Sequence, residues 1–287
     1  MSDKERTIWQ VQNCGRGSWE VNNWDAEIKT MSLQLTEEEQ KSPYAKYFYL
    51  GPANATLENE LAAQRGTLLA EEECFMPEDY ARIMNTSEIN RLHTGYRVMK
   101  NGIGFSLVRV KGEGINEEKM RFFQDHFRPA EKDLFYKIWF PGAHLRHYIN
   151  MAIEDVGCGL EAVEFVAPLN AQILGIDSSL AERDGACIGI SGGNGISYPL
   201  YHVSKFPRYA TAVRYTRDLP DGQETIFTVW HGVHWKDGKS VRMIPENEAV
   251  PEADARGQVQ HSMRELQTEF RNVQLFWDEQ KKKYSNI

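Results

Sequence analysis

The residues best suited to chemistry are a histidine and a glutamate four positions apart near the end of the chain. His261 and Glu265 fall in a stretch where Leu266, Phe270 and Val273 recur at helical spacing. Side chains at positions i and i+4 of a helix share one face, so both can reach the same ion. Imidazole nitrogen and carboxylate oxygen are ligands that suit zinc. A solvated His–Glu pair on a helix surface has the same spacing, so the pair alone leaves both interpretations open.

Two further residues could complete a metal site. His126 lies near the end of an expected aromatic helix, one turn after Phe122, where a histidine at the edge of a core is the simpler interpretation. Glu154 follows three apolar residues and precedes Asp155. Burying a carboxylate costs free energy unless the group is paired or bound to a metal. Both residues are therefore candidate ligands that need support from elsewhere in the sequence.

Other spacings suggest competing chemistry. Residues 189–193 have the G-x-S-x-G form of a serine hydrolase, with Ser191 as the nucleophile. That motif requires a strand, a tight turn and then a helix. The Gly-Gly-Asn-Gly run after Ser191 instead favours a hairpin turn between two strands. His231 and His234 could form a metal pair, but residues three apart on a strand point to opposite faces of the sheet.

An antiparallel sheet and one long helix must position these residues. Strand-like runs separated by turn signals span residues 103–110, 162–167, 186–191, 197–204, 209–217 and 224–235. A helix of about residues 254–283 ends the sequence. The pattern predicts an α+β fold, in which a curved antiparallel sheet is closed by the long C-terminal helix. Such a fold leaves a cavity between sheet and helix for a small apolar ligand.

Local signals predict the shorter helices. The signals are a capping box at Thr36-x-x-Glu39, a helix candidate at 56–65, a proline that starts a helix at Pro77, and a cap at Asn116 for a helix that runs to about Phe127. Residues 1–90 are therefore expected to form an irregular, partly helical domain that packs on a larger one, residues 91–287.

The composition argues against several classes of protein. A chain of 287 residues buries enough surface to fold without a metal or disulfides. The net charge of −8 argues against a nucleic-acid or anionic-membrane partner. No apolar run reaches the length of a membrane span and the first residues are polar, so a cytoplasmic location is expected. The four cysteines lie far apart and give neither a thiolate zinc knuckle nor a disulfide framework.

Four stretches, taken in order, resemble the family of diacetylphloroglucinol hydrolase and phloretin hydrolase. The stretches are Met120–Phe127, Tyr136–His144, Ile153–Gly157 followed by Val163–Pro168, and His261–Glu265 preceded by the Trp230–Gly238 hairpin. The resemblance covers residues 95 to 280, with a weaker N-terminal part. No stretch is diagnostic by itself, and the ordered set is much more specific than any one of them.

The resemblance implies a zinc-dependent hydrolase that cleaves the carbon–carbon bond between an acyl group and a phloroglucinol ring. The implied zinc ligands are His126, Glu154, His261 and Glu265. His202 matches a functionally important histidine on a strand in the middle of the sheet, and would move protons as a general acid–base. Tyr215 is the counterpart of a tyrosine that contacts the substrate ring.

The same resemblance implies a helix-grip, Bet v 1-like catalytic domain, a small N-terminal domain and a homodimer. The expected substrate is a small aromatic ketone, either phloretin or diacetylphloroglucinol. Other ring-contacting residues of the family do not map onto this sequence, and Pro129 stands where a polar side chain is expected, so the acyl group is left open. The helix-grip shape also serves simple ligand binding, which makes a non-catalytic carrier of an aromatic molecule the alternative.

Overall fold

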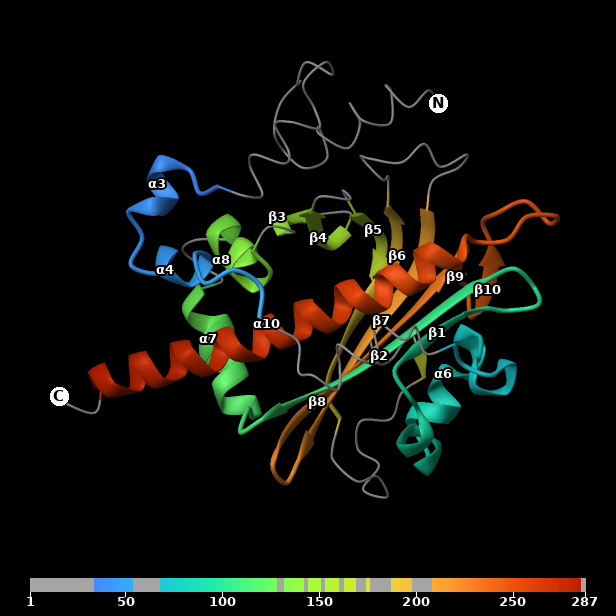
Figure 1. The fold of residues 1–287 in the computed structure, drawn as a ribbon, viewed down its shortest axis with the longest axis horizontal. Coiled ribbons are helices and arrows are strands. Elements are labelled where there is room, and N and C mark those ends of the chain that lie inside the picture. The colour runs from blue at the N-terminus through green and yellow to red at the C-terminus, as the bar shows by residue number, and fades with distance from the viewer. Residues whose placement is uncertain are drawn as a thin grey trace, which may run out of the picture.

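A six-stranded antiparallel sheet is the central layer of the structure. The computed structural model describes residues 34–53, 68–127, 132–141, 144–150, 153–159, 163–168, 174–175, 187–197 and 208–284. The sheet has the strand order β1-β2-β8-β7-β6-β5 (Figure 1). Its strands are β1 (Gly95–Val98), β2 (Gly104–Glu113), β5 (Val163–Pro168), β6 (Cys187–Ser197), β7 (Arg208–Leu219) and β8 (Gly222–His231). Strands β5 to β8 pair with their neighbours in sequence, which confirms the predicted antiparallel meander.

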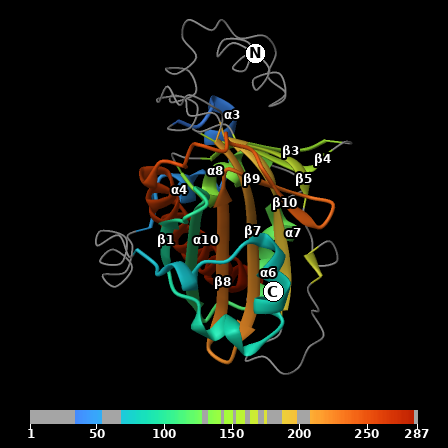
Figure 2. The same ribbon diagram turned by 90° about the vertical axis from the view of Figure 1, so that its right-hand side faces the viewer.

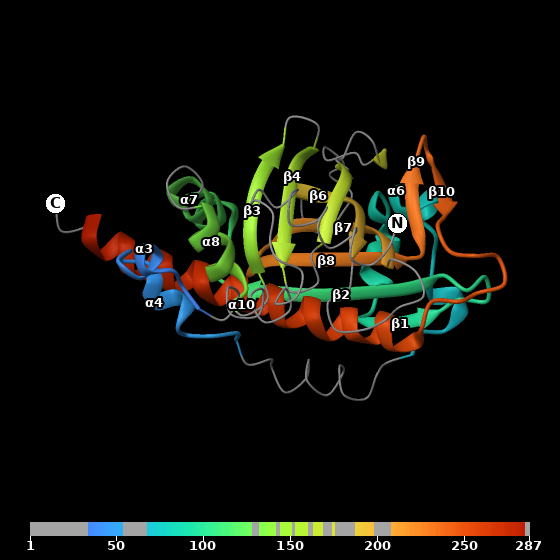
Figure 3. The same cartoon turned by 90° about the horizontal axis from the view of Figure 1, so that it is seen from above.

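One long helix, α10 (Glu252–Tyr284), lies along one face of this sheet (Figure 3). The helix runs in the same direction as β2, because Ser106 lies at Ala255 and Gly112 lies at Phe270. Strands advance about 3.3 Å per residue and helices about 1.5 Å, so these two spans are of matching length. The buried positions of the helix recur every three or four residues, at Val259, Met263, Leu266, Phe270, Val273 and Phe276.

The opposite face of the sheet is covered by α6 (Pro77–Met84) and the short 3₁₀ helix η3 (Ser87–Arg91) (Figure 2). Aromatic rings fill this second core, where Phe75 and Tyr80 contact Trp230 with ring centroids 5.9 and 5.6 Å apart. The indole N–H of Trp230 donates to the carbonyl of Phe75 at 2.7 Å. The sheet is therefore a middle layer with a separate apolar core on each face.

Shorter elements surround these three layers. They are α3 (Glu37–Gln40), α4 (Ala45–Phe48), η2 (Glu71–Glu73), α7 (Glu117–Phe127), α8 (Lys132–Trp139), a ribbon of β3 (His144–Asn150) and β4 (Ile153–Gly159), and a hairpin of β9 (Val233–Lys236) and β10 (Lys239–Arg242). Helices α4 and α7 pack on the C-terminal half of α10, where the ring of Phe276 contacts Tyr47, Phe122 and Phe123.

Most of the local predictions are confirmed. Those confirmed are the capping box at Thr36 and Glu39, the helix start at Pro77, the Asn116 cap of α7 and the long C-terminal helix. The helix predicted at 56–65 lies outside the described residues. Among the helices of the described segments, none is long and apolar enough to span a bilayer.

The predicted hairpin turn at residues 192–195 is wrong. Strand β6 continues through these residues and pairs with β7 along its length. A β-carbon at Gly192 would lie 2.2 Å from the carbonyl oxygen of Ala212, so glycine here permits close approach of two strands. The amide of Asn194 is buried and bonds both the carbonyl and the N–H of Trp235, at 2.7 Å each. These residues therefore mark packing sites inside a strand.

The predicted strand at 224–235 is broken in two. Gly232 has a φ of +83°, in the left-handed region that favours glycine, and separates β8 from β9. This break turns the chain out of the sheet and into the β9–β10 hairpin.

Residues 68–92 share the core of the sheet. Leu69, Phe75, Tyr80, Met84 and Ile89 are all buried among the side chains of β2, β7 and β8. This part of the predicted N-terminal domain is thus packed directly on the sheet. The assignment of residues 1–90 to a domain of their own stays a prediction.

Candidate functional site

His261 and Glu265 lie on the first half of α10 with their polar atoms close together. Nε2 of His261 is 3.7 Å from Oε2 of Glu265, and the side chains are 42% and 21% exposed. The ring of Phe140, which directly follows α8, meets the imidazole edge-on with centroids 5.0 Å apart. The pair is thus supported on one side by an aromatic ring and remains open to solvent on another.

The spacing of the two side chains is compatible with two of the ligands of one zinc ion, although the described residues contain no group of three or more such ligands. Bonds of about 2.0–2.2 Å place two ligand atoms of a tetrahedral zinc roughly 3.4 Å apart. The separation of 3.7 Å needs only a small rotation about the side-chain bonds to match this spacing. The helix supplies the spacing through its backbone, because i and i+4 lie one turn apart on one face. The donor set, one imidazole nitrogen and one carboxylate, also suits zinc.

For the other two predicted zinc ligands, the structure describes the position of the backbone but not of the side chain. His126 is in the last turn of α7 and Glu154 is the second residue of β4, and both side chains lie outside the described residues. The contacts between α7 and α10 are centred on Phe276, which is fifteen residues beyond His261, or about 22 Å along the helix axis. The described contacts of α7 therefore do not bring it to the His261–Glu265 pair.

The predicted general acid–base and the predicted ring-contacting residue also differ in placement. His202 lies outside the described residues. Tyr215 is fully buried in the core under α6, together with Val213 and Ile226. The structure therefore places Tyr215 on the face of the sheet away from α10, and does not bring it together with His261 and Glu265.

The positions of the competing motifs in the sheet do not give the geometry that their chemistry needs. Ser191 lies inside β6, which continues to Ser197, so the strand–turn–helix geometry of a serine hydrolase elbow is missing at this position. His231 is buried, with Nε2 3.2 Å from the hydroxyl of Ser106, whereas His234 stacks edge-on against Tyr209. The two histidines have different surroundings and do not form a metal pair with each other.

A buried ion pair that was not predicted from the sequence lies beside the His261–Glu265 pair. Glu269 lies one further turn along α10 and is 1% exposed, and Nη2 of Arg214 on β7 lies 2.6 Å from its Oε2. Burial raises the pKa of Glu269 above its ordinary value of 4.5, and the opposing effects of Arg214 and Trp139 only partly offset it. The sequence did contain a signal for Glu269. His261, Glu265 and Glu269 follow one another at intervals of four residues, which places Glu269 on the same face of the helix, among its apolar residues.

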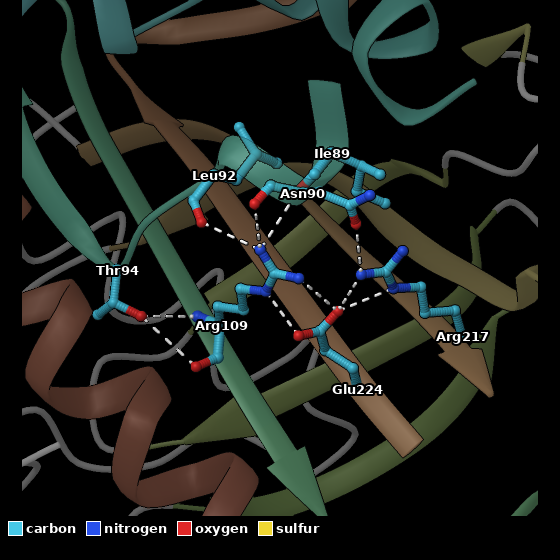
Figure 4. Close-up of polar contacts among 7 residues, drawn as sticks. All are labelled: Ile89, Asn90, Leu92, Thr94, Arg109, Arg217 and Glu224. Atoms are coloured by element: carbon cyan, nitrogen blue, oxygen red, sulfur yellow. Dashed lines mark hydrogen bonds and ion pairs between the residues drawn. The ribbon is translucent and has the colours of Figure 1, made fainter. Parts of the chain in front are cut away.

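A second buried charge cluster lies on the other face of the sheet. Arg109 binds the carboxylate of Glu224 through Nε at 2.5 Å and Nη2 at 3.0 Å, and Nε of Arg217 donates to the same carboxylate at 2.8 Å (Figure 4). Nη1 of Arg109 also donates to the carbonyls of η3 and the residues after it, and Arg217 donates to the side chain of Asn90 at 3.1 Å. The cluster joins η3 to the sheet on the face opposite α10.

Comparisons with known proteins assign no family to this chain. No protein-family model matches the sequence, and no curated protein matches it either.

Proposed function

We propose that this chain is a zinc-dependent hydrolase that cleaves the carbon–carbon bond between an acyl group and a phloroglucinol ring. The observation that carries the proposal is the His261–Glu265 pair, whose polar atoms lie 3.7 Å apart on one face of α10 and are partly exposed. The ordered resemblance described above supplies the reaction and the remaining ligands, His126 and Glu154. The α+β architecture, with a long helix along an antiparallel sheet, is compatible with the helix-grip fold that the resemblance implies.

The reaction adds water across the bond between the acyl carbon and the ring. Zinc, when bound, would supply a Lewis acid for the ketone oxygen and a water of lowered pKa. The acyl carbon gains the hydroxyl of water, the ring carbon gains a proton, and the bond between them breaks. Ring hydroxyls ortho and para to the acyl group make the ring carbon a feasible leaving group, because the ring can accept the proton as a keto tautomer. The products are a carboxylic acid and a phloroglucinol.

The residues of the chain would bind and orient the reactants. Helix α10 sets the spacing of His261 and Glu265, and Phe140 holds the imidazole ring by an edge-on contact. His202 remains our candidate for the group that carries the proton to the ring carbon. We do not assign Tyr215 a contact with the ring, because its side chain is buried on the other face of the sheet.

The experiment that tests this proposal compares metal content with turnover. We expect about one zinc per chain by plasma mass spectrometry, together with hydrolysis of phloretin or diacetylphloroglucinol. His261→Ala should lose both. His234→Ala is the matched control, because His234 also contacts an aromatic ring but lies on the β9–β10 hairpin, and it should retain both zinc and activity.

The alternative is a non-catalytic protein that binds an aromatic molecule between sheet and helix. Its supporting observation is that the described contacts of α7 lie far along α10 from His261. A wild-type protein that binds phloretin without zinc and without turnover would favour this alternative. A zinc-free protein that still hydrolyses the substrate would reject the zinc mechanism.

A further inference from the structure

The end of α8 is held against α10 by a buried side-chain amide. Nδ2 of Asn272 donates to the carbonyl of Ile138 at 2.7 Å, and both residues are fully buried. The last four carbonyls of a helix have no partner within it, and Ile138 is the second-last residue of α8. A carbonyl of this kind is costly to bury without a donor. Asn272 therefore supplies from another helix the hydrogen bond that the end of α8 needs.

The orientation of this amide is fixed from its other side. Nε of Arg271 donates to Oδ1 of Asn272 at 3.1 Å, and Nη2 of Arg271 donates to the carbonyl of Gly51 at 2.5 Å. A guanidinium can only donate, and a carbonyl can only accept. One orientation of the amide satisfies both of its neighbours, with the oxygen toward Arg271 and the nitrogen toward Ile138. The donor to α8 is thus held in place.

The two residues that follow this carbonyl in sequence also contact α10. Burial raises the pKa of Glu269, and the indole of Trp139 beside it partly offsets that rise. Phe140 meets the imidazole of His261 edge-on, with ring centroids 5.0 Å apart. A hydrogen bond weakens steeply when it is misdirected, whereas ring pairs are favourable over centroid distances of about 4.5–7 Å. The amide bond is therefore the contact that fixes where Phe140 lies along α10.

We infer that Asn272 is a positioning residue for His261, because it fixes the end of α8 and so holds Phe140 against the imidazole. Asn272 lies eleven residues beyond His261, or about 16 Å along the helix axis, so it acts through α8 and not by direct contact. An imidazole held in one orientation keeps its nitrogen where an ion can be shared with Glu265. The inference rests on the proposed function for the zinc ion alone, since Phe140 supports the imidazole without it.

The test measures the surroundings of the His261 imidazole in the metal-free protein. The ring current of Phe140 shifts the carbon-bound proton signals of the imidazole, so carbon–proton NMR spectra report whether Phe140 is in place. The signal of His261 is identified by its loss in His261→Ala. In Asn272→Asp an acceptor replaces the donor to Ile138, and the signal should move toward its position in Phe140→Leu. Asn272→Ala, which removes the donor without adding a charge, should move it in the same direction.

Thr268→Val is the matched control, because it deletes another buried hydrogen bond of α10. The hydroxyl of Thr268 accepts from the backbone N–H of Ala53 at 2.8 Å, one helical turn before Asn272. Its loss should lower the midpoint of thermal unfolding, as loss of the Asn272 bond does, but leave the His261 signal unchanged. A signal that stays at its wild-type position in both Asn272 variants, or that moves as far in Thr268→Val, would overturn the inference.

Zinc affinity gives a second measurement. Loss of a residue that orients a metal ligand from outside typically weakens binding roughly 10–100-fold, and we expect about a tenfold loss in Asn272→Asp and none in Thr268→Val. Equal affinity in a zinc-binding wild type and both Asn272 variants would contradict the inference. A wild type that binds no zinc would reject the proposed function, while the NMR comparison would still decide the role of Asn272.

Discussion

Arg109 and Arg217 share a single carboxylate, that of Glu224, on the face of the sheet covered by α6 (Figure 4). Because the Arg217 and Glu224 side chains are only 2% and 8% exposed, solvent cannot replace the missing partner if the carboxylate is removed. Glu224→Gln should therefore lower the free energy of unfolding by about 3–5 kcal/mol, the usual cost of leaving a buried charge unpaired. Urea unfolding measures this loss. Asp221→Asn, which breaks an exposed pair with Lys111 in the adjoining turn, should change the midpoint little.

Glu39 makes a contribution to the free energy of unfolding that is lost at acid pH. Burial alone would raise the pKa of Glu39, but the ammonium of Lys137 and the backbone N–H of Thr36 together hold it below its ordinary value of 4.5. A carboxyl group with a lowered folded-state pKa stabilises the fold fully above its unfolded-state pKa, and this contribution disappears as the pH falls through the folded-state pKa. The urea midpoint of wild type should thus exceed that of Glu39→Gln at pH 6, and the difference should shrink below pH 4.5. Glu38→Gln, at an exposed position, should show no such difference.

Helical spacing is enough to predict the His261–Glu265 pair from sequence, because both residues belong to one helix. The Arg214–Glu269 pair was missed, because it depends on how α10 lies over β7, and no local pattern encodes that crossing. The position of Tyr215 could not be predicted from the sequence for a similar reason. Alternation along a strand separates its two faces, but only packing decides which face meets α10 and which meets α6.

At the scale of elements, the approach of α10 to β2 depends on a glycine. A β-carbon at Gly112 would lie 2.7 Å from the ring of Phe270, so Gly112→Ala must push the helix or the ring away. We expect a loss of about 1–3 kcal/mol in the free energy of unfolding. Gly257→Ala lies within α10 itself and would meet nothing within 4 Å. It should instead stabilise the protein by about 0.5–1 kcal/mol through helix propensity, and thermal unfolding of the two variants gives the comparison.

The elements with strong periodicity were predicted well, and those defined by packing were not. The long helix and the meander follow from repeated apolar spacing, whereas α8 was missed because its eight residues are too few to establish a period. Gly192 and Asn194 were misread as a turn, since glycine and asparagine favour turns in general. In β6 they serve a close strand contact and a buried amide network, both of which depend on neighbouring strands.

At the scale of the whole molecule, the two cores share the sheet that separates them. Phe75 contacts both Phe105 and Trp230, so a residue from the N-terminal part of the chain packs on the middle of the sheet. Phe75→Ala should cost about 3–5 kcal/mol and lower the stability of the whole sheet. Urea unfolding followed by tryptophan fluorescence and by far-ultraviolet circular dichroism should give coincident curves in wild type and variant. Two separate transitions would instead support an N-terminal domain that unfolds on its own.

The contact between Ser106 and Ala255 has a consequence for the protonation of a histidine. The single hydroxyl proton of Ser106 is donated to the carbonyl of Ala255 at 2.9 Å, so the hydroxyl oxygen can only accept from Nε2 of His231 at 3.2 Å. Neutral His231 must then carry its proton on Nε2, which leaves Nδ1 as the basic nitrogen. Nitrogen-15 chemical shifts distinguish the two tautomers and would check this assignment of the proton to Nε2.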